Sequence, residues 1–303
     1  MTEEKTMRIV STKEQLLDAL QGHSRVGLVM TMGALHGGHL SLVKHLRSGH
    51  DCVVATIFVN PQQFGEGEDL DTYPRTLEAD VQALKNAQVD ILYVPTEDQV
   101  YPVEPRVRVQ PGPAGKVLEG YLRPGHFAGV LQVVGKMFNL VRPATAVFGQ
   151  KDAQQFVNIS QMVADLDQQV ELIEAPIVRD ARGLALSSRN SYLSERQLSE
   201  ATALHASLVA GETEALRGRT PEGIVRASAE VLKEAPGVEP EYVALADATS
   251  FDVFAMWTPD GQRLGVERLA TPTSQHSDAY LVLAARVGPA RLIDNVKVKI
   301  RDE

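Results

Sequence analysis

Residues 26–40 read VGLVMTMGALHGGHL, and this stretch decides how the rest of the chain is interpreted. A short apolar run, Val26–Met30, ends before Gly33, and a turn with two histidines, His36 and His39, follows. From His39 onward the apolar residues recur at helical spacing. The stretch therefore predicts a buried strand, a glycine turn and a helix.

The alternation of strands and helices continues through the first half of the chain. Cys52–Val59 is almost entirely apolar and rich in β-branched residues, as expected of a parallel strand buried on both faces. Further strands are predicted at Val89–Val94, Ala144–Phe148 and Val170–Ile177, and helices at His39–Ser48, Thr76–Ala87, Phe127–Val141 and Ala153–Leu166. This alternation predicts an α/β domain with a doubly wound, Rossmann-like parallel sheet, which we place at residues 1–177.

The second half has a different pattern. Ser194, with Gln197 three residues later, forms a plausible capping box, and Pro221 suits the first position of a helix. The predicted elements are helices at Ser194–Leu216 and Pro221–Glu234 and strands at Glu241–Leu245, Tyr280–Arg286 and Arg291–Lys299. Met256–Asp278 is polar and is expected to be a long surface loop. We therefore expect a smaller α+β lid domain at residues 178–303.

Composition excludes several classes of protein. The 303 residues carry a net charge of −9, so no basic excess indicates nucleic acid. The single cysteine, Cys52, rules out an intramolecular disulfide and is expected to be a buried thiol. The charged N-terminus resembles no signal peptide, and no apolar run is long enough to cross a membrane. We expect a cytoplasmic protein with no membrane partner.

The turn between the first strand and its helix is the strongest candidate for a ligand site. A helix N-terminus offers free N–H groups and positive potential to phosphate, and glycine lets the backbone lie close to a ligand. His36 and His39 can donate to phosphate oxygens. The alternative is a glycine turn with solvated histidines, whereas a zinc site lacks an obvious third ligand. Neither the dinucleotide fingerprint nor the P-loop motif is present.

Three further stretches combine polar side chains with predicted strand ends or with the domain boundary. FVNPQQFG (58–65) carries the neutral amides Asn60, Gln62 and Gln63, which suit hydroxyl and carboxylate groups, although it could be a polar turn. FGQKDAQQ (148–155) carries Lys151 and Asp152 for phosphate and ribose, although Asp152 could merely cap a helix. GLALSSRN (183–190) could clamp phosphate or act only as a linker.

Taken together, these stretches resemble one family over nearly the whole chain: pantothenate synthetase, or pantoate–β-alanine ligase, of the H-x-G-H nucleotidyltransferase superfamily. The resemblance also includes the strings DTYPRTLEAD, LEGYLRPGHFAGV and ARLIDN. It implies an amide-forming ligase that condenses pantoate with β-alanine, consumes ATP with Mg²⁺, and forms a homodimer. The reaction would pass through pantoyl adenylate and release pyrophosphate and AMP.

The resemblance also implies roles for individual residues. His36, His39 and Lys151 would be catalytic and contact the phosphates, and Asp152 would lie at the ribose. Gln63 and Gln155 would bind the pantoate and β-alanine substrates, and Asp80 would be an outer Mg²⁺ ligand. The ATP-binding residues would be Met32, Gly33, Ala34, Leu35, His36, Gly37, Gly38, His39, Gly149, Gln150, Lys151, Asp152, Val178, Leu186, Ser187, Ser188 and Arg189.

The sequence departs from the family pattern at three single positions, and the substitutions at Gln150 and Gln62 remove no proposed catalytic group. Met30 replaces the usual proline, so we expect a less rigid entry to the ATP turn. Gln62 replaces the usual methionine, so we expect a more polar pantoate pocket, and Gln150 replaces the usual glutamate.

Another adenylyltransferase of the same superfamily is the main alternative function. A scaffold without activity is a further alternative, against which the joint presence of the proposed phosphate ligands argues.

Overall fold

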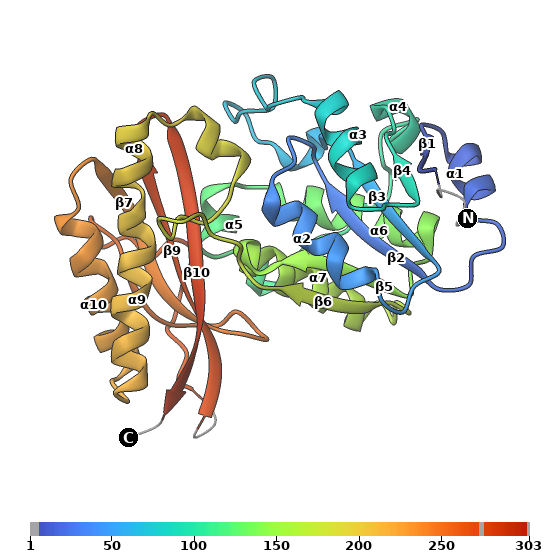
Figure 1. Cartoon of the computed structure of the whole chain (residues 1–303). Coiled ribbons are helices and arrows are strands. Elements are labelled where there is room, and N and C mark those ends of the chain that lie inside the picture. Colours follow the sequence, from blue (N-terminus) through green and yellow to red (C-terminus); the bar gives the residue numbers. More distant parts are fainter. Residues whose placement is uncertain (1–5, 273–275, 302–303) are drawn as a thin grey trace. The chain divides into compact units, whose positions relative to one another are not determined.

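The structure, a computed structural model, describes residues 6–272 and 276–301 (Figure 1). Part of the N-terminal stretch and residues 273–275 of the predicted loop lie outside these ranges. The chain divides into two compact units. Unit 1 contains residues 1–112, 123–149 and 158–176, and unit 2 contains residues 113–122, 150–157 and 177–303. The sequence prediction, with its boundary at 177/178, places segments 113–122 and 150–157 in the first domain, whereas the structure groups them with unit 2.

Unit 1 is built on a six-stranded parallel sheet in the order β1-β4-β3-β2-β5-β6. The strands are β1 (Arg8–Val10), β2 (Val26–Thr31), β3 (Cys52–Ile57), β4 (Ile91–Tyr93), β5 (Thr145–Gly149) and β6 (Glu171–Ala175). After β2 the chain adds β3 and β4 on one side and β5 and β6 on the other. The predicted doubly wound, Rossmann-like sheet is therefore confirmed, and its switch point lies between β2 and β5.

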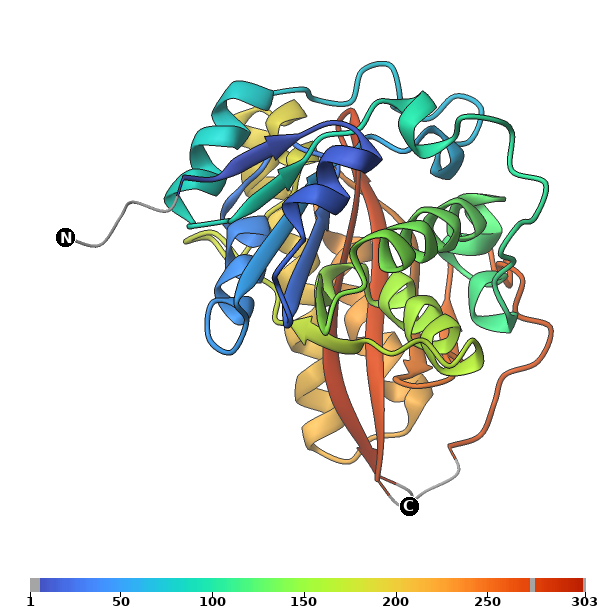
Figure 2. The same cartoon turned by 90° about the vertical axis from the view of Figure 1, so that its right-hand side faces the viewer.

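Helices cover both faces of this sheet, as Figures 1 and 2 show. The helices α2 (Gly37–Leu46) and α3 (Leu77–Asn86) bury Leu42, Leu46 and Leu84 in one core with strand residues of β2 and β3. The other face carries α1 (Lys13–Ala19) and α6 (His126–Val141), followed by the later part of α7 (Ala153–Asp165); α4 (Glu97–Val100) is a short helix after β4. Cys52 is fully buried in β3, as predicted.

Unit 2 has a four-stranded antiparallel sheet in the order β10-β9-β7-β8. The strands are β7 (Val238–Asp247), β8 (Val253–Trp257), β9 (His276–Val287) and β10 (Ala290–Arg301). Its helices are α5 (Glu119–Leu122), α8 (Glu195–Glu200), α9 (Thr202–Leu216) and α10 (Pro221–Glu234). This arrangement confirms the smaller α+β domain that the sequence predicts.

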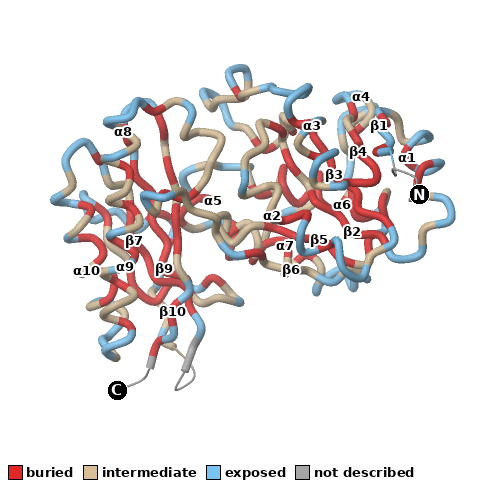
Figure 3. Tube along the Cα trace, viewed as in Figure 1, coloured by how far each residue is buried: buried red, intermediate tan, exposed pale blue. Residues whose placement is uncertain are grey.

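Both faces of this second sheet are buried, which explains why two short segments of the first half join unit 2. Alternate residues of β9 face opposite ways: Leu281 and Leu283 pack in the core with α9 and α10, whereas Val282 packs in a second core. That second core also contains Leu118 of segment 113–122 and Val157 of α7. The strands of both sheets are therefore largely buried (Figure 3).

The observed elements differ from the sequence prediction at several places, and β8, α4 and α5 are among the elements that were not predicted. The strand β1 and the helix α1, which begins with a Thr12–Gln15 capping box, were not predicted. The predicted helix Ser194–Leu216 is divided into α8 and α9 at Ala201, where the Thr202 hydroxyl donates to the carbonyl of Ser199 (2.7 Å). The predicted loop Met256–Asp278 is shorter, because its first residues pair as part of β8 with β7 and its last residues pair as part of β9 with β10.

Two local predictions in unit 2 are confirmed. Ser194 and Gln197 form the capping box of α8, and Pro221 occupies the first turn of α10 after the cap Thr220. Within the described part of the chain, none of the helices combines the length and apolar character needed to cross a lipid bilayer.

Candidate active site

The turn after β2, residues 32–39, is the centre of the candidate site in unit 1; we call it the histidine loop. Its backbone turns sharply, because Gly33 has φ +89° and Ala34 has φ 49°, both in the left-handed region. A side chain at Gly33 would meet Asp80 and Ile57 at 3.2 Å, so glycine also suits the available space. The helix α2 begins at Gly37, two residues earlier than predicted.

The two histidines cap this helix together. His36 is the N-cap residue, and its Nδ1 accepts a hydrogen bond from the Gly38 N–H (3.1 Å). The His39 Nδ1 lies 3.4 Å from the His36 backbone nitrogen, and the two rings stack with their centroids 4.0 Å apart. Because each Nδ1 accepts a hydrogen bond, a neutral imidazole at either position carries its own hydrogen on Nε2. Two Nε2–H donors next to a positive helix end suit an oligophosphate.

A buried carboxylate fixes the approach to the histidines. Asp80 of α3 is 2% exposed, and its Oδ2 and Oδ1 accept the N–H groups of Ala34 (2.9 Å) and Leu35 (2.8 Å). The Thr76 hydroxyl also donates to Oδ1 (3.1 Å). Asp80, which the resemblance implies as a magnesium ligand, thus holds the backbone of the histidine loop in this structure.

The turn after β3 lies beside the histidine loop. Asn60 caps the short 3-10 helix η1 (Pro61–Gln63), and Gln63 is 9% exposed. The Gln63 Nε2 donates to the sulfur of Met32 (3.2 Å), so the structure brings Gln63 to the same sheet edge as the histidine loop. This agrees with the expectation that the carboxyl ends of parallel strands share one edge.

Asn60 organises this turn, although the implied site did not include it. Its Nδ2 donates to Gln63 Oε1 and to the carbonyl of Gly129, both at 3.1 Å, and its Oδ1 accepts from the Tyr101 hydroxyl (3.0 Å). Gly129 permits this contact, because a side chain there would lie 2.1 Å from the Gln62 carbonyl. Burial raises the pKa of Tyr101, so its hydroxyl stays protonated as a donor.

A second set of contacts holds η1 from the side of α6. The His126 Nδ1 contacts the Gln63 carbonyl (2.7 Å), and Arg123 lies between His126 (3.1 Å) and the carboxylate of Glu68 (2.6 and 2.8 Å). Burial opposes ionisation of Glu68, but the Arg123 guanidinium outweighs it and lowers the pKa of Glu68. The amide of Gln63 is therefore supported through both its side chain and its backbone.

Apart from Gly149, the last residue of β5 in unit 1, the remaining candidates lie in unit 2 on two segments. The first, residues 149–152, begins where β5 ends, forms the 3-10 helix η3 (Gln150–Asp152) and leads into α7; we call it the lysine turn. Lys151 is 22% exposed, and its Nζ lies 3.7 Å from Asp152 Oδ1. The partly buried Gln155 lies in the first turn of α7. A cation and amide at this place suit the phosphate and substrate roles that the resemblance implies.

The second segment, residues 186–189, is the serine loop. It follows a small hairpin in which Leu186 N–H donates to the Val178 carbonyl (2.9 Å). The Ser187 Oγ accepts the N–H of Arg189 (3.3 Å) and caps the 3-10 helix η4 (Ser188–Tyr192). The Ser188 and Arg189 side chains lie in this same turn, so two hydroxyls and a guanidinium are concentrated over three residues.

Parallel strands, a switch point, and a helix capped by two histidines define the class of α/β protein with a doubly wound sheet and a helix N-terminus at its switch point. The comparisons with known proteins specify the family. The family model for pantoate-beta-alanine ligase matches residues 5–297. The chain belongs to this family of amide-forming ligases.

Individual relatives extend the likeness over both units. The pantothenate synthetase of Nocardia farcinica is 45% identical over 283 residues, which are 93% of this chain and 82% of the relative. The crystal structure of pantothenate synthetase from Thermus thermophilus has a TM-score of 0.85 at 41% identity and covers 96% of this chain and 99% of its own. A Francisella tularensis pantoate-beta-alanine ligase, complexed with beta-gamma ATP and beta-alanine, has a TM-score of 0.72 at 30% identity, with coverages of 96% and 97%.

Proposed function

We propose that this chain condenses pantoate with β-alanine at the expense of ATP. In the first step a pantoate carboxylate oxygen attacks the α-phosphorus, the bond to the β-phosphate breaks, and pyrophosphate leaves. In the second step the β-alanine amine attacks the acyl carbon of pantoyl adenylate, AMP leaves, and the amine loses a proton. The observation that carries this proposal is the paired histidine cap of α2 beside Gln63, in a chain of this family.

The two steps require different help from the protein. Adenylation places negative charge on the α-phosphoryl group and on pyrophosphate, so preorganised donors are the appropriate catalyst. The histidine loop, the lysine turn and the serine loop supply such donors, with Lys151 and Arg189 as cations. Asp152 would accept from the ribose and Val178 would contact adenine through its backbone. Acyl transfer mainly requires that the amine be placed against an activated acyl group.

The substrate pocket is proposed to use neutral amides. Gln63 and Gln155 can donate to the carboxylate and pair with the hydroxyls of pantoate. Gln63 is suited to this because its backbone and its amide are both held, as the contacts of Asn60 and His126 indicate. A preorganised amide loses little conformational freedom when a small substrate binds.

Magnesium is proposed to enter with ATP. Among residues 6–272 and 276–301, no group of three or more His, Cys, Asp or Glu side chains is arranged to hold a metal ion. Binding through substrate phosphates, with few protein ligands, is the usual mode of Mg²⁺. Asp80 remains the candidate outer ligand, in addition to its contacts with the histidine loop.

We further propose, on the family resemblance, that the enzyme is a cytoplasmic homodimer that binds no nucleic acid. Light scattering that gives the mass of one chain at micromolar concentration would contradict the dimer.

The activity itself is tested by AMP release, which should require both pantoate and β-alanine. AMP release that needs only one of them, or neither, would contradict the proposed reaction.

A further inference from the structure

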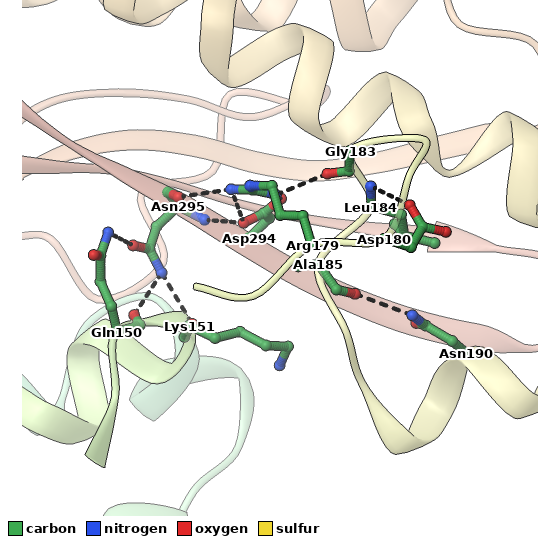
Figure 4. A network of polar contacts seen from close by, with 10 residues as sticks. All are labelled: Gln150, Lys151, Arg179, Asp180, Gly183, Leu184, Ala185, Asn190, Asp294 and Asn295. Atoms are coloured by element: carbon green, nitrogen blue, oxygen red, sulfur yellow. Dashed lines mark hydrogen bonds and ion pairs between the residues drawn. The ribbon is translucent and has the colours of Figure 1, made fainter. Parts of the chain in front are cut away.

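The lysine turn is attached to the middle of β10, far away in the sequence. The Nδ2 of Asn295 donates to the carbonyls of Gln150 and Lys151, both at 2.9 Å. In return, Gln150 Nε2 donates to Asn295 Oδ1 (3.1 Å). Figure 4 shows these contacts, with the Lys151 side chain extending away from Asn295. The amide of Asn295 thus satisfies two carbonyls of the turn and leaves the lysine ammonium for other partners.

The residue before Asn295 is attached to the segment that leads to the serine loop. Arg179 donates to both oxygens of Asp294 (2.6 and 3.0 Å) in a two-point ion pair, and to the carbonyl of Gly183 (3.1 Å). The Asp294 side chain is only 1% exposed. Two-point pairs of arginine and carboxylate fix direction as well as distance. Asp294 therefore sets the position of residues 179–183.

A short hairpin connects Arg179 with the serine loop, so the contact of Arg179 with Asp294 also fixes where Ser187 lies. Arg179 pairs with Ala185 as an isolated antiparallel bridge, and Asp180 accepts the Leu184 N–H (3.0 Å). At the far end, the Asn190 side chain donates to the Ala185 carbonyl (3.0 Å). Ion-pair, β-bridge and hydrogen-bond contacts thus connect Asp294 to the hairpin that leads into the serine loop, and Figure 4 shows the contacts of Arg179, Asp180 and Ala185.

The two attachments lie on opposite faces of the sheet of unit 2. Neighbouring residues of a strand point to opposite faces, and β10 follows this rule: Leu292 packs in the core with α9 and α10, and Ile293 packs against the other core. Asp294 accordingly shares the face of α9, and Asn295 that of the lysine turn. One peptide unit of β10, further braced by the Asn295 N–H bonded to Asp294 Oδ1 (2.8 Å), therefore links both segments.

We propose that Asp294 and Asn295 are positioning residues that hold the lysine turn and the serine loop at a fixed spacing for adenylation. The inference rests on the proposed function, in which both segments contact the phosphates of ATP. Both residues are 2% exposed, so they act through the segments they hold and not by touching the reacting atoms.

The Asn295→Asp variant tests this assignment. It keeps the size of the side chain but removes the donor and turns a carboxylate oxygen toward two carbonyl oxygens. A displacement of about 1 Å from the productive geometry can cost about 10²-fold in rate. We expect pantoate-dependent ATP–pyrophosphate exchange to fall by about that factor, in kcat more than in KM for ATP. Acyl transfer from preformed pantoyl adenylate to β-alanine should stay close to the wild-type rate.

The matched control is Asn139→Asp, which removes an exposed side-chain amide that donates to the Gly135 carbonyl on α6. It should leave both half-reactions unchanged. Arg179→Lys, which keeps the charge but loses the two-point pair, should reproduce the selective loss and decides the question if Asn295→Asp does not fold. Equal losses in both half-reactions, or unchanged exchange with a lower Tm, would overturn the proposal. Wild-type protein without pantoate-dependent exchange would instead contradict the proposed function.

Discussion

The histidine loop and the lysine turn are both proposed phosphate sites at strand ends, yet different kinds of contact hold them. In the histidine loop the capping contacts are local: His36 caps Gly38, and His39 lies three residues away. The lysine turn is held by Asn295, which is separated from it by 144 residues of sequence or more. The histidine loop is therefore held mainly by residues of its own motif, whereas the lysine turn is held by a residue that no local sequence motif predicts.

The comparison depends first on whether the histidines act on phosphate. His39→Ala should lower pantoate-dependent ATP–pyrophosphate exchange by about 10²–10³-fold, because one preorganised donor to developing charge typically contributes that much. Pyrophosphate has left before acyl transfer, so the variant should use preformed pantoyl adenylate at a rate close to wild type. Rapid-quench measurement of both half-reactions checks this.

The control for that experiment is His45→Ala, an exposed position in the last turn of the same helix. It should leave both half-reactions at the wild-type rate. If His39→Ala lowers both half-reactions equally, His39 serves acyl transfer or the fold, and the histidine loop would no longer be a phosphate site of the proposed kind.

Asp80 makes two long-range hydrogen bonds to the histidine loop, and its substitution sharpens the comparison. Asp80→Asn replaces one acceptor oxygen by an NH₂ group that faces a backbone N–H of Ala34 or Leu35. The displaced loop should lower kcat/KM for ATP by about 10²-fold, since small displacements of catalytic groups have effects of that order. Steady-state kinetics with ATP as the varied substrate measures this loss.

Glu78→Gln on the same helix supplies the control, because Glu78 is exposed and its charge is removed without touching the loop. A lower Tm for Asp80→Asn together with an unchanged kcat/KM for ATP would show that Asp80 stabilises the fold alone. The histidine loop would then not depend on Asp80 for its position.

Local patterns in the sequence were sufficient to predict most of the fold. The apolar run of β3 and the alternation around it predict a parallel sheet, since such strands are buried on both faces. The capping box of α8 and Pro221 in α10 were also predicted, because each depends on residues a few positions apart. The strand β1 was missed because its three residues show no clear period.

The contacts between distant segments could not be predicted in the same way. Nothing near Asn60 shows that Tyr101 and Gly129 will complete its hydrogen bonds, and nothing near Lys151 indicates Asn295. Segments 113–122 and 150–157 join unit 2 because its sheet needs a cover on its second face, which is a property of the assembled sheet. Such partners are set by tertiary packing and leave no periodic signal.

The substrate side of unit 1 is tested by Gln63→Ala. An unpaired polar partner in a desolvated site costs about 1–3 kcal/mol, which corresponds to about 5- to 150-fold. KM for pantoate should rise within this range, whereas KM for ATP should hardly change. The control is Gln82→Ala, whose exposed amide contacts only the Asn86 side chain among the hydrogen bonds described. A comparable rise in both KM values would remove Gln63 from the pantoate pocket.

The smallest expected effect is on the pH dependence of the free energy of unfolding, through His205, which lies near Arg179 and Asp294 in unit 2. Burial lowers the pKa of His205 on α9, and the positive charge of Arg179 lowers it further, while Asp294 and Glu212 partly oppose this. In the unfolded chain the histidine takes up a proton near pH 6.5, whereas in the folded protein it does so only at lower pH. The unfolded state then binds more protons, so the free energy of unfolding should decrease as the pH falls below about 6.5.

His205→Gln removes this proton uptake and keeps a neutral side chain of similar size. Urea unfolding at pH 7.5, 6.5 and 5.5 should therefore show a stability difference between wild type and variant that shifts in favour of the variant as the pH falls. His45→Gln, at an exposed position of α2, is the matched substitution outside unit 2. A difference that stays constant over this range would mean that folding does not lower the pKa of His205, through burial or through Arg179. In that case His205 would not be coupled to the charge of Arg179, and the ion pair with Asp294 would be the contact left to orient Arg179.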